Sequence, residues 1–181
     1  FTPLAKGMNS EYANQNGYDC IQVHGGSGFM LEYACQRIYR DARITSIYEG
    51  TTQLQTVAAI RYVTNGFYSS VIEDYAQMPV AAELEGIKSR VAAMAEKFNA
   101  SVAKVKEAEN QELHDLCARH LYEMAADVIM CHLLMQNASK APEIFMHSLE
   151  VYANHAEAEV AKHATLVERM TVEQLDNYRQ A

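Results

Sequence analysis

LHDLCARHLYEMAADVIMCHLLM, residues 113–135, is the most regular stretch of this sequence. Its core positions step by 4, 3, 4, 4, 3 and 4 residues, and they are Leu113, Cys117, His120, Met124, Val128, Cys131 and Met135. Side chains at these spacings fall on one face of an α-helix. The pattern therefore predicts a long helix that buries this face against other helices.

The segments on either side repeat the same spacing. The upstream series is Ile87, Val91, Met94, Phe98, Val102 and Val105, and the downstream series is Phe145, Leu149, Tyr152, Ala156, Val160, His163, Val167 and Met170. The breaks between the series, at residues 109–110 and 138–142, are short, so neighbouring helices should run antiparallel. We expect an all-α fold with three long antiparallel helices over about residues 80–170.

A bundle of three helices needs a fourth element to close it. The candidates are a helix near residues 51–64, a short carboxyl-terminal helix, and another copy of the chain. Thr171 with Gln174 three residues later resembles a capping box that would open the short helix. Pro142 suits the first turn of the last long helix.

Residues 1–65 show shorter helical segments. We expect helices over residues 3–23 and 31–42, and a third from residue 51 or 52 to about 63. The glycine-rich residues 24–28 should end the first helix. Asn65-Gly66 is a second stop signal, so we expect a domain boundary between residues 1–65 and 66–181.

Composition narrows the classes of function. The net charge is −8, and residues 1–65 contain five acidic and five basic side chains, so residues 66–181 carry the whole excess. An acidic surface disfavours nucleic acid and anionic membranes as partners. No window resembles a membrane span or a signal peptide. Because the chain begins with Phe1 rather than Met, we expect it to be a piece of a longer protein.

Cysteine and histidine usage predicts no metal site. Cys20, Cys35, Cys117 and Cys131 include no Cys-x-x-Cys pair, and we interpret them as free buried thiols in a reducing compartment. A ferritin-like di-iron site needs Glu-x-x-His pairs, which residues 66–181 lack. His120 and His163 are better interpreted as hydrogen-bonded core histidines.

Two segments of residues 1–65 have patterns typical of ligand-binding or catalytic sites. The first is QVHGGSGF, residues 22–29, where glycines after a helix let backbone approach a bulky ligand and offer N–H groups to phosphate. The second is RDAR, residues 40–43, followed by IYEGTTQLQ, residues 47–55, with Glu49 at a helix entrance. Each segment also has a purely structural interpretation. Glycines often cap the carboxyl terminus of a helix, and a glutamate is often found at a helix amino terminus, where the helix dipole stabilises its charge.

Together and in this order, the segments resemble the end of the acyl-CoA dehydrogenase family. The resemblance runs without a gap from Gln22 to Arg61, and residues 1–21 fit the preceding helix. Residues 66–181 look like the additional helical tail of some relatives. The resemblance implies α,β-dehydrogenation of an acyl-CoA thioester to the trans-2-enoyl-CoA, as in fatty acid β-oxidation, with FAD as the hydride acceptor.

The resemblance also implies site residues. Glu49 matches the family's α-proton base, and Gly50 leaves room where substrate and flavin meet. Thr51 and Gln53 match positions that hydrogen-bond FAD, while Gln22, Gly25 and Gly26 match positions near its adenosine diphosphate half. We read Arg40, Asp41 and Arg43 as structural ion pairing.

Partners and location follow from the same resemblance. It implies a homodimer or homotetramer, an acyl-CoA substrate, electron-transferring flavoprotein as the electron acceptor, and either the bacterial cytoplasm or the mitochondrial matrix. Two alternatives stay open: a helical oligomerisation or partner-docking module in residues 66–181, and an acyl-CoA oxidase. We expect the 181-residue chain alone to be helical, colourless and inactive, since most flavin contacts lie outside it.

Overall fold

The computed structural model describes residues 1–180, and it describes the side chains of all of these except Leu175 and residues 178–180. All regular secondary structure in this part of the chain is helical, as the periodicity predicted. The chain divides into two compact units, Phe1–Ala59 and Ile60–Ala181, and each is described by itself.

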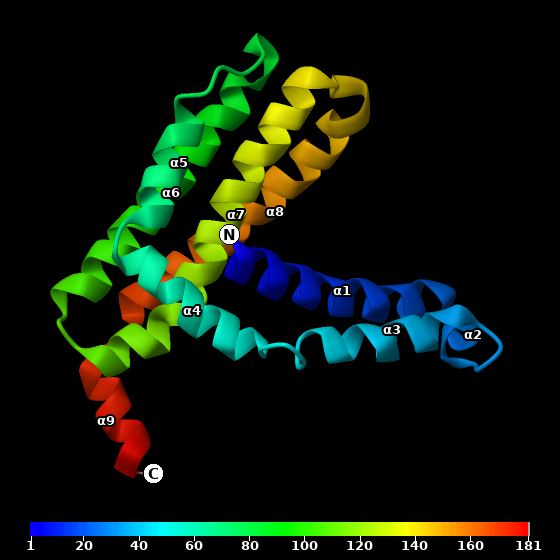
Figure 1. The fold of residues 1–181 in the computed structure, drawn as a ribbon, viewed down its shortest axis with the longest axis horizontal. Coiled ribbons are helices and arrows are strands. Elements are labelled where there is room, and N and C mark those ends of the chain that lie inside the picture. The colour runs from blue at the N-terminus through cyan, green and yellow to red at the C-terminus, as the bar shows by residue number, and fades with distance from the viewer. Residues whose placement is uncertain (181) are drawn as a thin grey trace. The chain divides into compact units, whose positions relative to one another are not determined.

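The first unit is built on two helices that run side by side in opposite directions (Figure 1). They are α1, Thr2–His24, and α3, Ala34–Thr45, and a single-turn helix α2, Gly26–Phe29, lies in the connection between them. A Cβ at Gly17 would lie 3.0 Å from the Cα of Tyr39, so glycine permits this close packing. The sequence predicted α1 closely, missed α2, and placed α3 three residues too early.

The helix α4, Thr52–Thr64, agrees with the predicted third helix and crosses from the first unit into the second. The second unit continues with α5, Phe67–Ala76; the 3-10 turn η1, Ala82–Leu84; and the long helices α6, Glu85–Glu107, α7, Gln111–Lys140, and α8, Pro142–Arg169. The last helix is α9, Val172–Gln180. The three long helices confirm the spacing argument, and Pro142 stands in the first turn of α8.

The core of the second unit follows the predicted helix faces. The helices α6, α7 and α8 all pack on one another. Their buried residues include Val91, Met94, Phe98, Cys117, Met124, Val128, Met135, Leu149, Val160 and Val167. Asn110 caps α7 by accepting hydrogen bonds from the N–H groups of Glu112 and Leu113 at 3.0 and 2.9 Å. Arg90 on α6 adds an ion pair to Glu157 on α8 at 2.6 Å.

The fourth element of the bundle is α5, which the sequence analysis missed. It packs on α6 and α7 and buries Tyr68 and Ile72 completely or nearly so. The proposed closing helix near residues 51–64 is therefore wrong as the main partner, whereas α9 does contact α7. The predicted capping box of α9 is confirmed: Thr171 N–H donates to Gln174 Oε1 at 3.2 Å, and Gln174 N–H donates to Thr171 Oγ1 at 3.4 Å.

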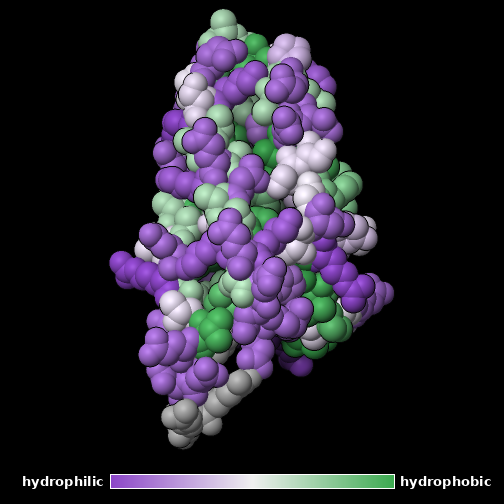
Figure 2. All heavy atoms as spheres, turned by 90° about the vertical axis from the view of Figure 1, so that its left-hand side faces the viewer, coloured by the Kyte–Doolittle hydropathy of each residue, from purple (hydrophilic) through white to green (hydrophobic). Residues whose placement is uncertain are grey.

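The surface of the second unit is mainly polar where α5 and α6 lie. Figure 2 looks onto this side and shows hydrophilic side chains with apolar groups in separated patches. This face therefore gives no support to the alternative of a helical oligomerisation or partner-docking module. None of the helices over the described residues is long and apolar enough to cross a membrane.

Candidate active site

Glu49 lies in the short connection between α3 and α4. Its φ is 50° and that of Gly50 is 93°, so two consecutive residues adopt left-handed backbone. For a non-glycine residue this conformation costs about 1–3 kcal/mol and needs outside support. The Thr52 N–H donates to the Ser46 carbonyl at 3.1 Å and closes the turn. A Cβ at Gly50 would lie 2.7 Å from Gln55 Nε2, so glycine fits best there.

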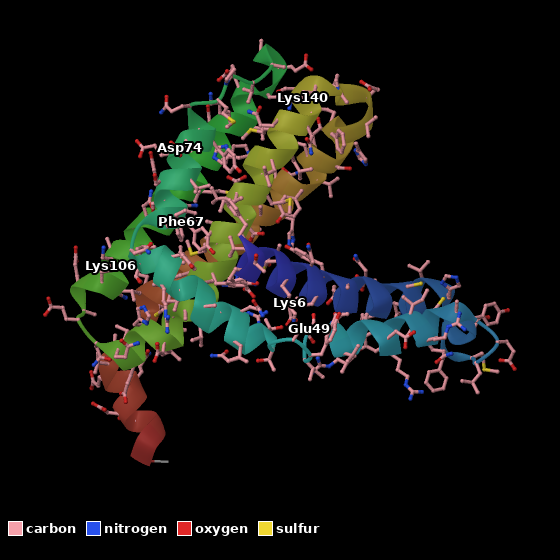
Figure 3. All side chains as sticks on the ribbon, viewed as in Figure 1. Lys6, Glu49, Phe67, Asp74, Lys106 and Lys140 are labelled. Carbon is pink, nitrogen blue, oxygen red and sulfur yellow. The ribbon has the colours of Figure 1, made fainter. Side chains whose placement is uncertain are left out.

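Lys6 on α1 supplies further support for the Glu49 turn. Its ammonium group donates to the carbonyl oxygens of Tyr48 and Gly50 at 3.0 and 2.5 Å, and it lies 5.7 Å from the centre of the Tyr48 ring. Figure 3 shows Lys6 extending from α1 toward the turn that carries Glu49. The carbonyls before and after Glu49 are thus held by one side chain, while the Glu49 side chain itself is exposed.

The residues after Glu49 open α4. Thr51 Oγ1 accepts a hydrogen bond from the Leu54 N–H at 3.2 Å, which caps the helix. Thr52 Oγ1 donates to Glu11 Oε1 on α1 at 2.6 Å, so the amino terminus of α4 is tied to α1. The Thr51 hydroxyl uses its oxygen as an acceptor in this cap, which leaves its proton available to a ligand.

An open groove lies beside this turn. Its volume is about 640 Å³, and its lining includes Lys6, Asn9, Ser10, Tyr48 and Glu49. The walls come from α1 and from the end of α3, so the backbone packing of these two helices positions the carboxylate at the groove. An accessible carboxylate, a nearby ammonium group and hydroxyl groups can exchange a proton with a polar ligand.

The glycine segment forms the turn from α1 into α2. Gly25 has a φ of 58°, and its N–H donates to the Gln22 carbonyl at 3.1 Å. A Cβ at Gly28 would lie 2.5 Å from the Ile21 carbonyl oxygen, so this glycine allows α2 to pack on α1. Gly26 has open space around its missing Cβ, and the Gln22 side chain is exposed. Both can therefore contact a ligand.

The structure separates the predicted site residues into two groups. Glu49, Thr51 and Gln53 lie together at the α3–α4 turn, near Lys6. Gln22 lies sixteen residues beyond Lys6 along α1, about 24 Å away at 1.5 Å per residue. One ligand can touch both groups only if it is long, and two copies of a ligand can each touch one.

Sequence reasoning missed Lys6 and Glu11, because single polar residues on a helix have no distinctive spacing. It was wrong about ion pairing at Arg40, Asp41 and Arg43. Over the described residues the structure records no ion pair for these three side chains. Arg43 instead donates a hydrogen bond to Ser46 Oγ, at the start of the Glu49 turn.

A second polar cluster lies between α7 and α8. His163 Nε2 lies 2.9 Å from Glu123 Oε2, and His163 Nδ1 lies 2.8 Å from His120 Nδ1. Burial acts to raise the pKa of Glu123, but hydrogen bonds from His163 and Arg119 outweigh it and lower this pKa to about 2. When neutral His163 donates from Nε2, its Nδ1 accepts from His120. The prediction of hydrogen-bonded core histidines is confirmed.

The sequence analysis did not identify two further buried polar groups in the second unit. Burial raises the pKa of Asp127 to about 6, although its carboxylate accepts a 2.8 Å hydrogen bond from the Tyr152 hydroxyl. Burial lowers the pKa of His132 to about 4, and its Nε2 has no hydrogen-bond partner. Asp127 lies three residues after Met124 and His132 lies four after Val128, so the helical spacing placed both beside the predicted buried face.

Two family models match the chain. The model described as "Acyl-CoA dehydrogenase, C-terminal domain" matches residues 1–63, which carry Glu49 and the glycine turn. The model described as "Acyl-CoA dehydrogenase C terminal" matches residues 64–175, which hold the helical bundle. The two matches meet within α4.

Curated relatives share the first part of this similarity. An acyl-CoA dehydrogenase of Bacillus subtilis is 38% identical over 63 residues, which cover 35% of this chain and 17% of that protein. The mitochondrial long-chain specific acyl-CoA dehydrogenase of Sus scrofa is 42% identical over 62 residues, which cover 34% and 14%. The caffeyl-CoA reductase-Etf complex subunit CarC of Acetobacterium woodii is 46% identical over 52 residues, which cover 29% and 14%. The matched segments span less than a fifth of these relatives.

A solved structure shares the fold. The crystal structure of an acyl-CoA dehydrogenase family protein from Porphyromonas gingivalis is similar with a TM-score of 0.59 and 38% sequence identity. The similarity covers 63% of this chain and 98% of that chain.

Proposed function

We propose, from the premise that the chain belongs to the acyl-CoA dehydrogenase family, that it is the carboxyl-terminal part of a flavin-dependent enzyme. The complete enzyme would convert an acyl-CoA thioester to the trans-2-enoyl-CoA. The observation that carries this proposal is the supported left-handed turn that presents the Glu49 carboxylate beside an open groove. Strained backbone of this kind is concentrated at functional sites.

Glu49 is proposed as the base that removes the α-proton of the thioester. Its carboxylate is exposed and flanked by carbonyls that Lys6 holds in place, so the turn is positioned before substrate arrives. A positioned base typically contributes about 10²–10⁴-fold to a rate. Gly50 keeps the space beside this carboxylate free of a side chain.

The residues present fit FAD, which when bound supplies the acceptor for the hydride from the β-carbon. Gln53 is exposed, and the Thr51 hydroxyl proton is available, so both can donate hydrogen bonds to a ligand at the α3–α4 turn. Gln22, Gly25 and Gly26 can receive the adenosine diphosphate half at the end of α1. The distance between the two groups favours contacts to different copies of the cofactor, and hence a homodimer or homotetramer.

The substrate and the electron acceptor of the complete enzyme are proposed from the relatives. Two of them are acyl-CoA dehydrogenases, and one is a subunit of a complex with Etf. We infer acyl-CoA as the substrate class and electron-transferring flavoprotein as the acceptor. An acyl-CoA oxidase would share Glu49 but would reoxidise rapidly with O₂, so the oxygen reactivity of the reduced enzyme distinguishes the two.

Replacing Glu49 by glutamine in the complete enzyme tests the proposal. Glu49→Gln keeps the size and polarity of the side chain but cannot accept the proton. We expect bound FAD to be retained, and its anaerobic reduction by acyl-CoA to slow by about 10³-fold or more. Stopped-flow absorbance in the flavin band measures this rate.

Glu109 offers a matched control. It is the other non-glycine residue with positive φ among the described residues, at 48°, and it lies in the α6–α7 turn. Glu109→Gln should leave flavin reduction unchanged. Near-normal reduction in Glu49→Gln, or an equal loss in both variants, would contradict the assignment of the base.

A further inference from the structure

Three potential metal ligands meet where α1 ends and α3 begins. The ligand atoms of Cys20, His24 and Cys35 all lie within 4.8 Å of one another. Cys20 and His24 are one helical turn apart on α1, with Cys20 Sγ 3.9 Å from His24 Nδ1. Cys35 is the second residue of α3 and is buried. The cluster therefore depends on the antiparallel packing of the two helices.

The surroundings of His24 favour coordination, whereas a hydrogen bond with Cys35 raises the pKa of the Cys20 thiol, whose proton a metal must displace. His24 Nδ1 lies 2.9 Å from the Cys20 carbonyl oxygen, and metal-bound histidines commonly donate their second ring N–H to such a group. Binding through Nε2 would keep this hydrogen bond, whereas binding through Nδ1, which lies 3.9 Å from Cys20 Sγ, would need the ring to turn away from the Cys20 carbonyl.

The donor set is typical of zinc. Two thiolates and one imidazole make a Cys₂His set that leaves one tetrahedral position open. In such a set the ligand atoms lie about 3.6–3.8 Å apart, given Zn–S near 2.3 Å and Zn–N near 2.0–2.1 Å. The observed cluster needs a contraction of about 1 Å, which rotation of the exposed His24 ring and the partly exposed Cys20 side chain can supply.

We propose that Cys20, His24 and Cys35 bind one Zn²⁺ ion, with a water molecule or another ligand in the fourth position. Both thiols lose their protons on binding, and the two thiolates neutralise the ion. The ion would tie the end of α1 to the start of α3 across the Gly25–Gly28 turn. The proposal does not depend on the flavin chemistry, and it reverses the expectation from the sequence that the chain holds no metal ligands.

Cobalt substitution tests the site in the 181-residue chain. The chain is kept reduced with a phosphine and titrated with Co²⁺, then with Zn²⁺. We expect one equivalent of Co²⁺ to give tetrahedral ligand-field bands and a thiolate-to-cobalt charge-transfer band, all removed by one equivalent of Zn²⁺. A weak octahedral spectrum without the charge-transfer band would overturn the proposal.

Variants assign the ligands. Cys20→Ala and Cys35→Ala should each weaken Zn²⁺ binding by at least about 100-fold, and His24→Ala by about 10-fold or more. Cys117→Ala, which removes a buried thiol of α7, is the matched control and should bind normally. Unchanged affinity in Cys35→Ala would overturn the proposal.

Cysteine alkylation of the unmodified chain tests the site without any variant, so its result does not depend on whether a variant folds. Bound Zn²⁺ should slow alkylation of Cys20 and Cys35 at least tenfold and leave Cys117 and Cys131 unaffected. Equal alkylation rates with and without Zn²⁺ would count against the site. A disulfide between Cys20 and Cys35, in a chain that binds no metal when reduced, would also overturn the proposal.

Discussion

The two units of this chain bury their apolar side chains to very different extents. Within residues 1–59, all of which the structure describes, Leu4, Cys35 and Ala59 are the buried apolar residues, while Val23, Phe29 and Leu31 are 79–85% exposed. The second unit instead buries a continuous series along α6, α7 and α8. Helices with similar composition therefore differ in whether they contain a core of their own.

This difference indicates which contacts stabilise each unit. The antiparallel helices of the second unit cover one another and bury a core within the chain. Residues 1–59 expose large apolar side chains over α1, α2 and α3, which is typical of surfaces that another protein segment covers. The unit with the proposed catalytic residues therefore presents more apolar surface for contacts outside the unit, although α1 and α3 pack on one another within it.

A pair of phenylalanine variants provides the largest test of this comparison. Phe98 is fully buried on α6, whereas Phe29 on α2 is 79% exposed. We expect Phe98→Ala to lower the free energy of unfolding of the chain by about 3–5 kcal/mol, because it leaves a cavity. Phe29→Ala should change it by less than about 0.5 kcal/mol. Urea unfolding followed by circular dichroism measures both, and similar losses would break the comparison.

His132 provides a test through pH. Its folded pKa is lowered by burial from 6.5 to about 4, so the unfolded chain binds the proton more readily between these values. Its contribution to stability is therefore lost as pH falls from about 6.5 toward 4. Between pH 6.5 and 5 this amounts to about 2 kcal/mol. His132→Leu should remove that loss, as seen in urea unfolding at pH 7.5 and 5.

Asp127 changes the pH dependence of stability in the opposite direction to His132. Comparing the unmodified chain with the His132→Leu variant removes this effect, because Asp127 is present in both. Its pKa is raised to about 6 from 3.8, so its contribution falls as pH rises through that range. The difference between the unmodified chain and His132→Leu isolates the histidine. His147→Leu, at an exposed position of α8, serves as the control and should follow the unmodified chain. A His132→Leu variant with unchanged acid sensitivity would show that His132 is not the source.

Two lysines that donate hydrogen bonds to backbone carbonyls give the comparison with the smallest expected effects. Lys104 donates to the Val167 and Met170 carbonyl oxygens at 2.8 and 3.3 Å, at the end of α8. Lys104→Met should cost about 1 kcal/mol of stability and leave turnover of the complete enzyme unchanged. Lys6→Met should lower that turnover about tenfold, with little change in melting temperature, because it loosens the Glu49 turn. A loss of turnover in Lys104→Met, together with a loss of stability but not of turnover in Lys6→Met, would contradict the roles proposed for the two units.

Much of the fold could be predicted because helical spacing reports burial directly. The faces containing Met94, Val128 and Val160 were found from spacing alone, since their partners lie on neighbouring helices of the same chain. The closing helix α5 was missed because its Tyr68 and Ile72 make too short a series to stand out. Partition between core and surface in residues 1–59 was also harder to predict, since few of its apolar residues are buried within the chain.

The candidate site was predicted in part for a similar reason. Motif resemblance located Glu49 and the glycine turn, because these residues are adjacent in sequence. Lys6 could not be found, since its role exists only when α1 lies beside the α3–α4 turn. The Cys20, His24 and Cys35 cluster likewise requires two helices to meet.

The sequence by itself determined the helical class, the three long helices with their buried faces, and the family. These follow from local periodicity and from contiguous motifs, both of which are written along the chain. Only the tertiary structure decided that α5 closes the bundle, that Lys6 supports the Glu49 turn, and that two thiols and an imidazole converge. Each of these depends on a contact between residues distant in sequence, and the packing of helices sets such contacts where spacing cannot.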